Sequence, residues 1–157
     1  LGLAGLGHGE YRATASALET ASVCTIPFDG LQNLADHLPS LNHQLHKIMS
    51  QRISRDQETL LLLGDKSAHE RLATFLLNIS SRFAERGFSP SEFNLSMSRQ
   101  DIANYLGLTL ETISRTFSQF QKEGVLDVDR RLIRIVDRAH LSKASGACFS
   151  ETSSATR

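Results

Sequence analysis

The sequence lacks an excess of charge of either sign. Its 157 residues include 17 Lys and Arg and 17 Asp and Glu, so the formal net charge at pH 7 is zero. This balance excludes a polybasic, histone-like nucleic-acid binder, and it counts mildly against DNA binding in general. Between Ser98 and Arg138 there are seven basic and six acidic residues. Charge alone therefore does not identify a nucleic-acid binder here.

Long apolar runs are also lacking. Leu60 to Leu63 is an uninterrupted apolar stretch, but a membrane span needs about 20 such residues. The Gly-rich first nine residues carry no basic segment, which argues against a signal peptide. The chain starts at Leu1 rather than Met, so we expect a fragment. We predict a protein without a membrane partner that resides in the cytoplasm.

Cysteines are few, and catalytic motifs are missing. Cys24 and Cys148 are the two cysteines; they make no disulfide framework and fit a reducing cytosol. There is no Ser/His/Asp, Walker or HExxH arrangement, so no enzyme is expected. His43 and His46 have a spacing that would bind metal only weakly, and solvated or partner-facing helix positions explain them better.

The first thirty residues are typical of β-structure. Apolar and polar residues alternate from Tyr11 to Leu18, and Val23–Ile26 forms a second short run that ends at Pro27. Two strands cannot close a core on their own. We therefore predict that residues 1–30 are the last piece of a larger sheet.

Residues 31–65 are expected to form two helices. Leu31, Leu34 and Leu38 mark a short helix stopped by Pro39, and Ser40 is a good N-cap for a long helix through Leu63. Along this helix a stripe recurs at spacings of 3 and 4, as in a coiled coil. Its members are His46, Met49, Ile53, Asp56 and Leu60. The stripe favours a homodimer; a single amphipathic helix packed on a monomer's core is the alternative.

Residues 66–141 are predicted to form a winged helix-turn-helix. A helix over residues 68–86 comes first, and Ser98 to Asp101 then resembles a capping box that starts a second helix. Gly107 suits a tight turn, and Thr109 caps the next helix, which runs from Leu110 to about Glu123. Strands over residues 125–128 and 132–135, joined by residues 129–131, make a wing. Residues 142–157, rich in Ser, Ala and Thr, are expected to be a disordered tail.

The whole fold is therefore predicted to be α+β and mostly helical. In this motif the N-terminal part of the second helix of the pair enters the major groove. Several of its polar residues are expected on the outer face, and the wing arginines are expected near phosphates. The expected backbone contacts are Ser98, Arg99, Thr109, Thr112, Gln119 and Arg130. A helical pair without a nucleic-acid partner is the alternative, as is a purely structural dimerisation module.

Residues 104–115, Asn-Tyr-Leu-Gly-Leu-Thr-Leu-Glu-Thr-Ile-Ser-Arg, carry the most specific resemblance to a known family. With residues 19–28, 70–73 and 82–90, they make the chain similar to the CRP/FNR family of bacterial transcription regulators, in its FNR/Anr-like subgroup. The resemblance implies that Glu111, Ser114 and Arg115 contact bases in palindromic sites with TTGAT-like half-sites. Thr116 departs from the family, which usually has an apolar core residue there.

The same resemblance implies partners for the other parts of the chain. It implies that residues 1–30 are the C-terminal remnant of an N-terminal β-roll sensor domain. It places Ile53 and Asp56 on a dimerisation helix. There, facing Asp carboxylates would repel each other and keep the protein monomeric until a signal arrives. It also suggests RNA polymerase contacts near Thr20 and Arg86.

Cys24 matches the family's internal ligand of an oxygen-labile 4Fe–4S cluster. Such clusters need thiolates, usually four, and this chain has no second cysteine near Cys24. We therefore expect no cluster in this chain alone and an oxygen or redox response in an intact protein. A relative that has lost the cluster, and a CRP-type regulator that senses a small ligand, are the alternatives.

Overall fold

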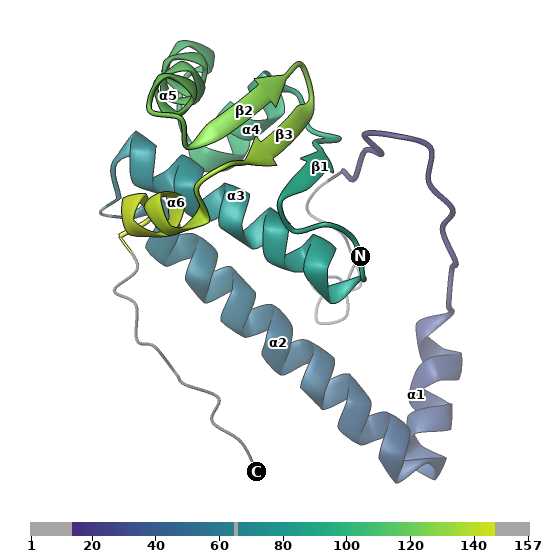
Figure 1. Ribbon diagram of the computed structural model, residues 1–157. Coiled ribbons are helices and arrows are strands. Elements are labelled where there is room, and N and C mark those ends of the chain that lie inside the picture. Colours follow the sequence, from purple (N-terminus) through teal and green to yellow (C-terminus); the bar gives the residue numbers. More distant parts are fainter. Residues whose placement is uncertain (1–13, 65, 147–157) are drawn as a thin grey trace. The chain divides into compact units, whose positions relative to one another are not determined.

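The computed structural model describes residues 14–64 and 66–146, which form six helices and three strands (Figure 1). The chain divides after Leu60 into two compact units, which are described separately below. No helix within these described ranges is long and apolar enough to cross a membrane. The prediction of a mostly helical α+β fold is confirmed.

The first unit contains one whole helix, most of a second, and little core. Helix α1 spans Phe28–His37 and begins after Pro27 without a side-chain cap. Helix α2 spans Pro39–Leu63. The predicted N-cap at Ser40 is therefore wrong: the helix starts at Pro39, because a proline at the first helical position gives up an N–H that has no helical partner anyway. Among the described residues of this unit, only Ala35 is buried.

The strands predicted within residues 11–28 do not form where the structure can be described. Residues 14–27 adopt neither helix nor strand, and all are exposed; residues 11–13 lie outside the described part. The pattern failed because a strand needs a neighbour for its backbone groups, whereas the alternating residues here are mostly Ala, Ser and Thr and bury little apolar surface. The larger sheet stays a prediction.

The second unit has a continuous hydrophobic core. Helix α3 spans Ala68–Glu85, α4 Arg99–Leu106 and α5 Leu110–Lys122. They pack with a three-stranded antiparallel sheet of order β1-β3-β2, made of Glu92–Asn94, Leu132–Ile135 and Leu126–Asp129. The fully buried residues at its centre include Leu72, Leu76, Ile102, Ile113, Phe120 and Ile133.

Strand β1 was not predicted from the sequence. Its Phe93 lies opposite Ile133 of β3 and is buried. Ser80 of α3, also buried, supports the loop before β1: its hydroxyl donates to the Pro90 carbonyl at 2.6 Å and accepts from Nη1 of Arg138 at 2.6 Å. The strand is thus held by partners far away in the sequence.

Helix α6, Arg138–Ala144, corrects the predicted tail. The Asp137 side chain caps it by accepting from the His140 N–H, and Leu141 is fully buried. Lys66 Nζ donates to the Ser145 carbonyl at 2.9 Å. Residues 142–146 therefore belong to the folded unit, because the helix is capped and packed; residues 147–157 lie outside the described part.

Candidate nucleic-acid interface

Helix α4 begins with the capping box that the sequence predicted. The Ser98 N–H donates to Asp101 Oδ2 at 2.8 Å, and the Asp101 N–H donates to Ser98 Oγ at 3.2 Å. Hydrogen bonds from the Ser98 side chain and backbone lower the pKa of the Asp101 carboxyl below its ordinary value. The start of the helix pair is thereby fixed by its own first turn.

The turn between α4 and α5 is also as predicted. Gly107 has φ +63°, in the left-handed region that favours glycine. The Leu108 N–H donates to the Ala103 carbonyl at 2.9 Å. Arg71 of α3 adds a support that was not predicted, because its Nη1 donates to the Leu106 carbonyl at 3.0 Å. The turn is therefore held by backbone hydrogen bonding and by a side chain of α3.

Helix α5 has one buried side and one exposed side. Thr109 caps it by accepting from the Thr112 N–H. Ile113, Phe117 and Phe120 face the core. Thr116 is also buried, and its hydroxyl donates to the Thr112 carbonyl at 2.8 Å. A satisfied hydroxyl costs little in a core, so the helix tolerates a threonine there.

The exposed side of α5 carries the residues expected to contact bases. The side chains of Glu111 and Arg115 are each 81% exposed and lie 3.9 Å apart as an ion pair across one turn. A shallow hollow follows the same side of the helix. It is lined by Ser114, Arg115, Ser118, Gln119 and Lys122. Ser118 and Lys122 were not singled out from the sequence, although their spacing from Ser114 and Arg115 places them on this side.

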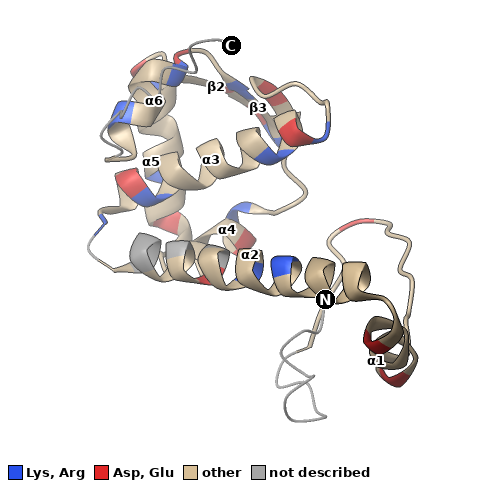
Figure 2. Ribbon diagram, turned by 90° about the horizontal axis from the view of Figure 1, so that it is seen from below, with Lys and Arg blue, Asp and Glu red and all other residues tan. Residues whose placement is uncertain are grey.

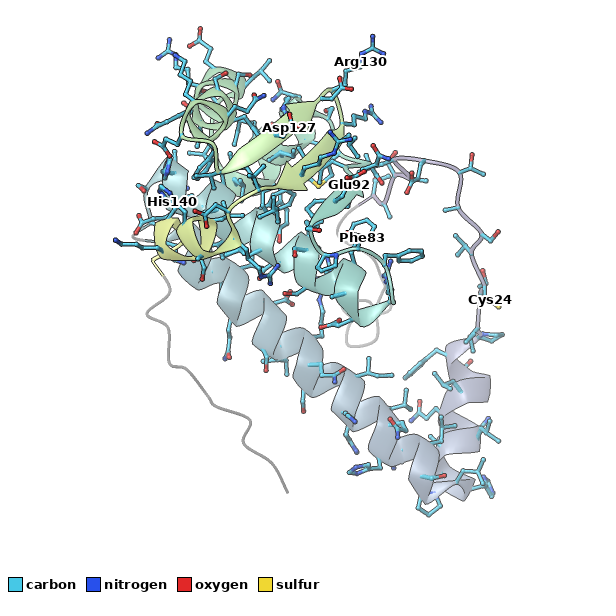
Figure 3. The ribbon with its side chains drawn as sticks, in the orientation of Figure 1. Cys24, Phe83, Glu92, Asp127, Arg130 and His140 are labelled. Atoms are coloured by element: carbon cyan, nitrogen blue, oxygen red, sulfur yellow. The ribbon has the colours of Figure 1, made fainter. Side chains whose placement is uncertain are left out.

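The wing arginines differ in their surroundings. Arg130 is exposed at the tip of the β2–β3 hairpin, with φ +55° (Figure 3). Arg134, in contrast, donates to Glu92 at 2.9 Å and to Asp127 at 3.1 Å, and these carboxylates raise its pKa. Its guanidinium therefore ties the three strands together, while that of Arg130 points outward.

Arg99, one of the expected contacts to the DNA backbone, is half-buried against α5. Its guanidinium carbon lies 3.4 Å from the centre of the Phe117 ring, a cation–π contact, and burial lowers its pKa. Figure 2 shows basic and acidic residues interspersed along the elements of this unit, in line with the balanced charge of the sequence.

Comparison with known proteins agrees with this geometry. Residues 70–144 match the model of the Crp-like helix-turn-helix domain. The chain is 50% identical to the transcriptional activator protein FnrA of Stutzerimonas stutzeri, over 95% of this chain and 61% of that protein. It is 49% identical to the fumarate and nitrate reduction regulatory protein of Escherichia coli K12, over 93% of this chain and 58% of the relative. This chain belongs to the CRP/FNR family.

A solved structure supports the assignment. FixK2 from Bradyrhizobium japonicum superposes with a TM-score of 0.71 and 35% identity, covering 77% of this chain and 60% of that one. The chain thus spans about three fifths of the length of these CRP/FNR relatives. The relatives are named as transcription regulators, which agrees with the expectation that the chain is not an enzyme.

The stripe of residues that was predicted to form the dimer contact is exposed along α2. Met49, Ile53 and Leu60 are 36%, 60% and 71% exposed, and His46 and Asp56 are exposed as well. Arg52 Nε donates to Asp56 at 3.2 Å. The sequence analysis missed this pair, although its i, i+4 spacing is the ordinary signal for one.

The residues expected to bind an iron–sulfur cluster or RNA polymerase are exposed. Cys24 has an exposed thiol in the extended segment before α1 (Figure 3). Within residues 14–64 and 66–146 no three metal-ligating side chains come together, and Cys148 lies outside these ranges. Thr20 is exposed in the first unit, and Arg86 is exposed where α3 ends.

Proposed function

We propose that this chain binds DNA through the exposed side of α5, with Glu111, Ser114 and Arg115 contacting base edges in the major groove. The observation that carries the proposal is the two-sided burial of α5: its core side is fixed by the rest of the unit, and the opposite side presents Glu111 and Arg115 81% exposed. An arginine bonds guanine bidentately, and a glutamate accepts from cytosine N4.

Contacts to the DNA backbone would position these three residues. The first turns of α4 and α5 lie at the positive ends of two helices, where phosphates bind well. Arg130 at the tip of the wing adds a cation on the same unit. The proposed backbone contacts are Ser98, Arg99, Thr109, Thr112, Gln119 and Arg130.

We propose that the protein acts as a homodimer on palindromic TTGAT-like half-sites. The exposed stripe of Met49, Ile53 and Leu60 on α2 supports this, because three large apolar side chains on one helix leave a surface that a second copy would cover. Two-fold symmetry in the protein then matches two-fold symmetry in the DNA.

The test is fluorescence anisotropy with a palindromic duplex of two TTGAT-like half-sites and with a scrambled duplex. Arg115→Ala should cost about 1–3 kcal/mol of discrimination at one base pair. Arg82→Ala, which removes an exposed arginine from α3, is the matched control and should leave discrimination unchanged. Equal loss of affinity for both duplexes in Arg115→Ala would contradict a base contact.

For the intact protein, we propose cytoplasmic transcription regulation that responds to oxygen or redox state. The exposed Cys24 thiol fits one ligand of a 4Fe–4S cluster, but the described residues supply no other thiolate, so they do not hold a cluster by themselves. Surfaces around Thr20 and Arg86 are the proposed polymerase contacts. A Cys24→Ser change in the intact protein should abolish an oxygen response; a response that persists would favour a small-ligand sensor or a cluster-less regulator.

A further inference from the structure

His69 of α3 joins the last turn of α5 in a way that no part of the proposed function uses. Its ring lies on the fully buried Phe120, with ring centres 4.0 Å apart. Its Nε2 lies 4.0 Å from Glu123 Oε2. An imidazole is thus held on the core side of α5, against the residue that ends the helix.

Glu123 in turn holds a residue on the DNA-facing side. The Gln119 side-chain amide donates to Glu123 Oε1 at 2.9 Å, across one turn of α5. Gln119 lines the exposed hollow with Arg115 and Lys122. The two carboxylate oxygens of Glu123 therefore have different partners: Oε2 lies near the imidazole, and Oε1 accepts from Gln119.

The charge of Glu123 is unfavourable for two reasons. As the C-cap of α5 it sits at the negative end of the helix dipole. It also lies beside a surface that would approach phosphates, which repel a carboxylate. A positive charge on His69 would offset both effects, because it lies at the same helix end and next to the carboxylate.

We propose that His69 positions the C-terminal end of α5 for DNA through Glu123 and Gln119, and that protonated His69 strengthens DNA binding. This inference rests on the proposed function, in which α5 contacts DNA. The charged groups around His69 are Glu123 on α5, Glu70 on α3 and Lys66. Glu70 interacts electrostatically with both His69 and Lys66. Imidazoles change charge between about pH 5 and 8, so the effect is measurable as a pH profile.

The first experiment measures DNA affinity by anisotropy at about pH 6 and about pH 8. The unchanged chain should bind about 2- to 5-fold more tightly at the lower pH, the size of a partly exposed charge pair. In His69→Gln this ratio should fall to near one. In His69→Lys, the lysine is charged at both pH values. The ratio should therefore also be near one, while binding stays tight at both.

A matched control removes another histidine of the same unit. His140 is exposed on α6 (Figure 3), so His140→Gln should keep the full pH ratio. Glu123→Gln should raise affinity at the higher pH and flatten the profile. A His69→Gln variant that keeps the ratio of the unchanged chain would overturn the proposal.

A second measurement needs no DNA and separates this inference from the proposed function. The NMR signal of the Gln119 side-chain amide should shift with pH in the unchanged chain and stay constant in His69→Gln and Glu123→Gln. Failure to bind DNA at either pH would refute the proposed function alone. An amide signal that ignores pH in the unchanged chain would overturn the positioning role of His69.

Discussion

Helices α2 and α3 are neighbours in the sequence, yet they differ in how far their apolar side chains are buried. In α3, Leu72 and Leu76 are fully buried. In α2, Ile53 and Leu60 are 60% and 71% exposed. Both helices space apolar residues three and four apart, although the stripe of α2 also includes His46 and Asp56. This spacing alone does not tell whether a helix packs on its own chain or on another molecule. The presence of partner elements in the same unit decides it.

The helix ends show the same contrast. In the second unit, α3, α4, α5 and α6 all start at a side-chain cap. In the first unit, α1 starts without one. The caps are Ser67, Ser98, Thr109 and Asp137. The second unit therefore supplies its own core and its own helix caps, whereas the first leaves large apolar side chains of its helices exposed.

The largest effect should come from matched leucines in the two helices. Leu76→Ala leaves a cavity in a packed core and should lower the free energy of unfolding by about 2–5 kcal/mol. Leu60→Ala removes an exposed side chain and should change it by less than about 0.5 kcal/mol at concentrations where the chain is monomeric. Urea denaturation measures both. Equal losses would break the contrast between α2 and α3.

The second effect concerns self-association of α2. Ile53→Ala should weaken the dimer about tenfold, because it removes apolar area from the stripe. Asp56→Ala should raise the dimer content, because two like charges would no longer face each other, even though Arg52 offsets part of that charge in the single chain. Sedimentation equilibrium measures both. Unchanged dimer content in both variants would mean that α2 does not meet a second copy.

A third, smaller effect should follow from removing a cap. Ser98→Ala loses the side-chain oxygen that accepts from the Asp101 N–H, although the N–H of residue 98 can still donate to Asp101, and it should cost about 1 kcal/mol of unfolding free energy. Ser40→Ala, in the first turn of α2, removes no cap and should cost less than about 0.5 kcal/mol. Thermal or urea unfolding distinguishes them. A costly Ser40→Ala would show that α2 depends on its own first turn as α4 does.

The smallest effect is a dependence on acid. Hydrogen bonds from Ser67 and Ser98 lower the pKa of Glu70 and Asp101, respectively. A carboxyl whose pKa is lowered on folding stabilises the fold at neutral pH, and that contribution is lost as the pH falls below about 4. Asp101→Asn should therefore flatten the loss of stability in acid. A fall as steep as in the unchanged chain would assign it to other groups.

Local signals made the helix-turn-helix predictable. The Ser98 cap, Gly107 and the Thr109 cap each act within four residues, and each appears in the structure as expected. The wing hairpin was found for the same reason, because its strands are joined by two residues. These features form from neighbours in the sequence, so the sequence alone reveals them.

The features that were missed depend on distant partners. Strand β1 pairs with β3 about forty residues later, and α6 is held by Arg138 on Ser80. At the site, the outward positions on α5 followed from helical spacing. The contact of Arg99 with Phe117 and that of His69 with Glu123 did not, because α3, α4 and α5 had first to be packed. Where such a partner is lacking, as for residues 14–27, the predicted strand does not form.

The bond from Lys66 to the Ser145 carbonyl has a consequence for how the unit is attached. Lys66 lies where the chain enters the unit after α2, and Ser145 lies where it leaves after α6. The beginning and the end of the described part of this unit therefore lie close together. A domain whose ends lie close together tolerates insertion into another chain, because its two ends can be joined to neighbouring positions there.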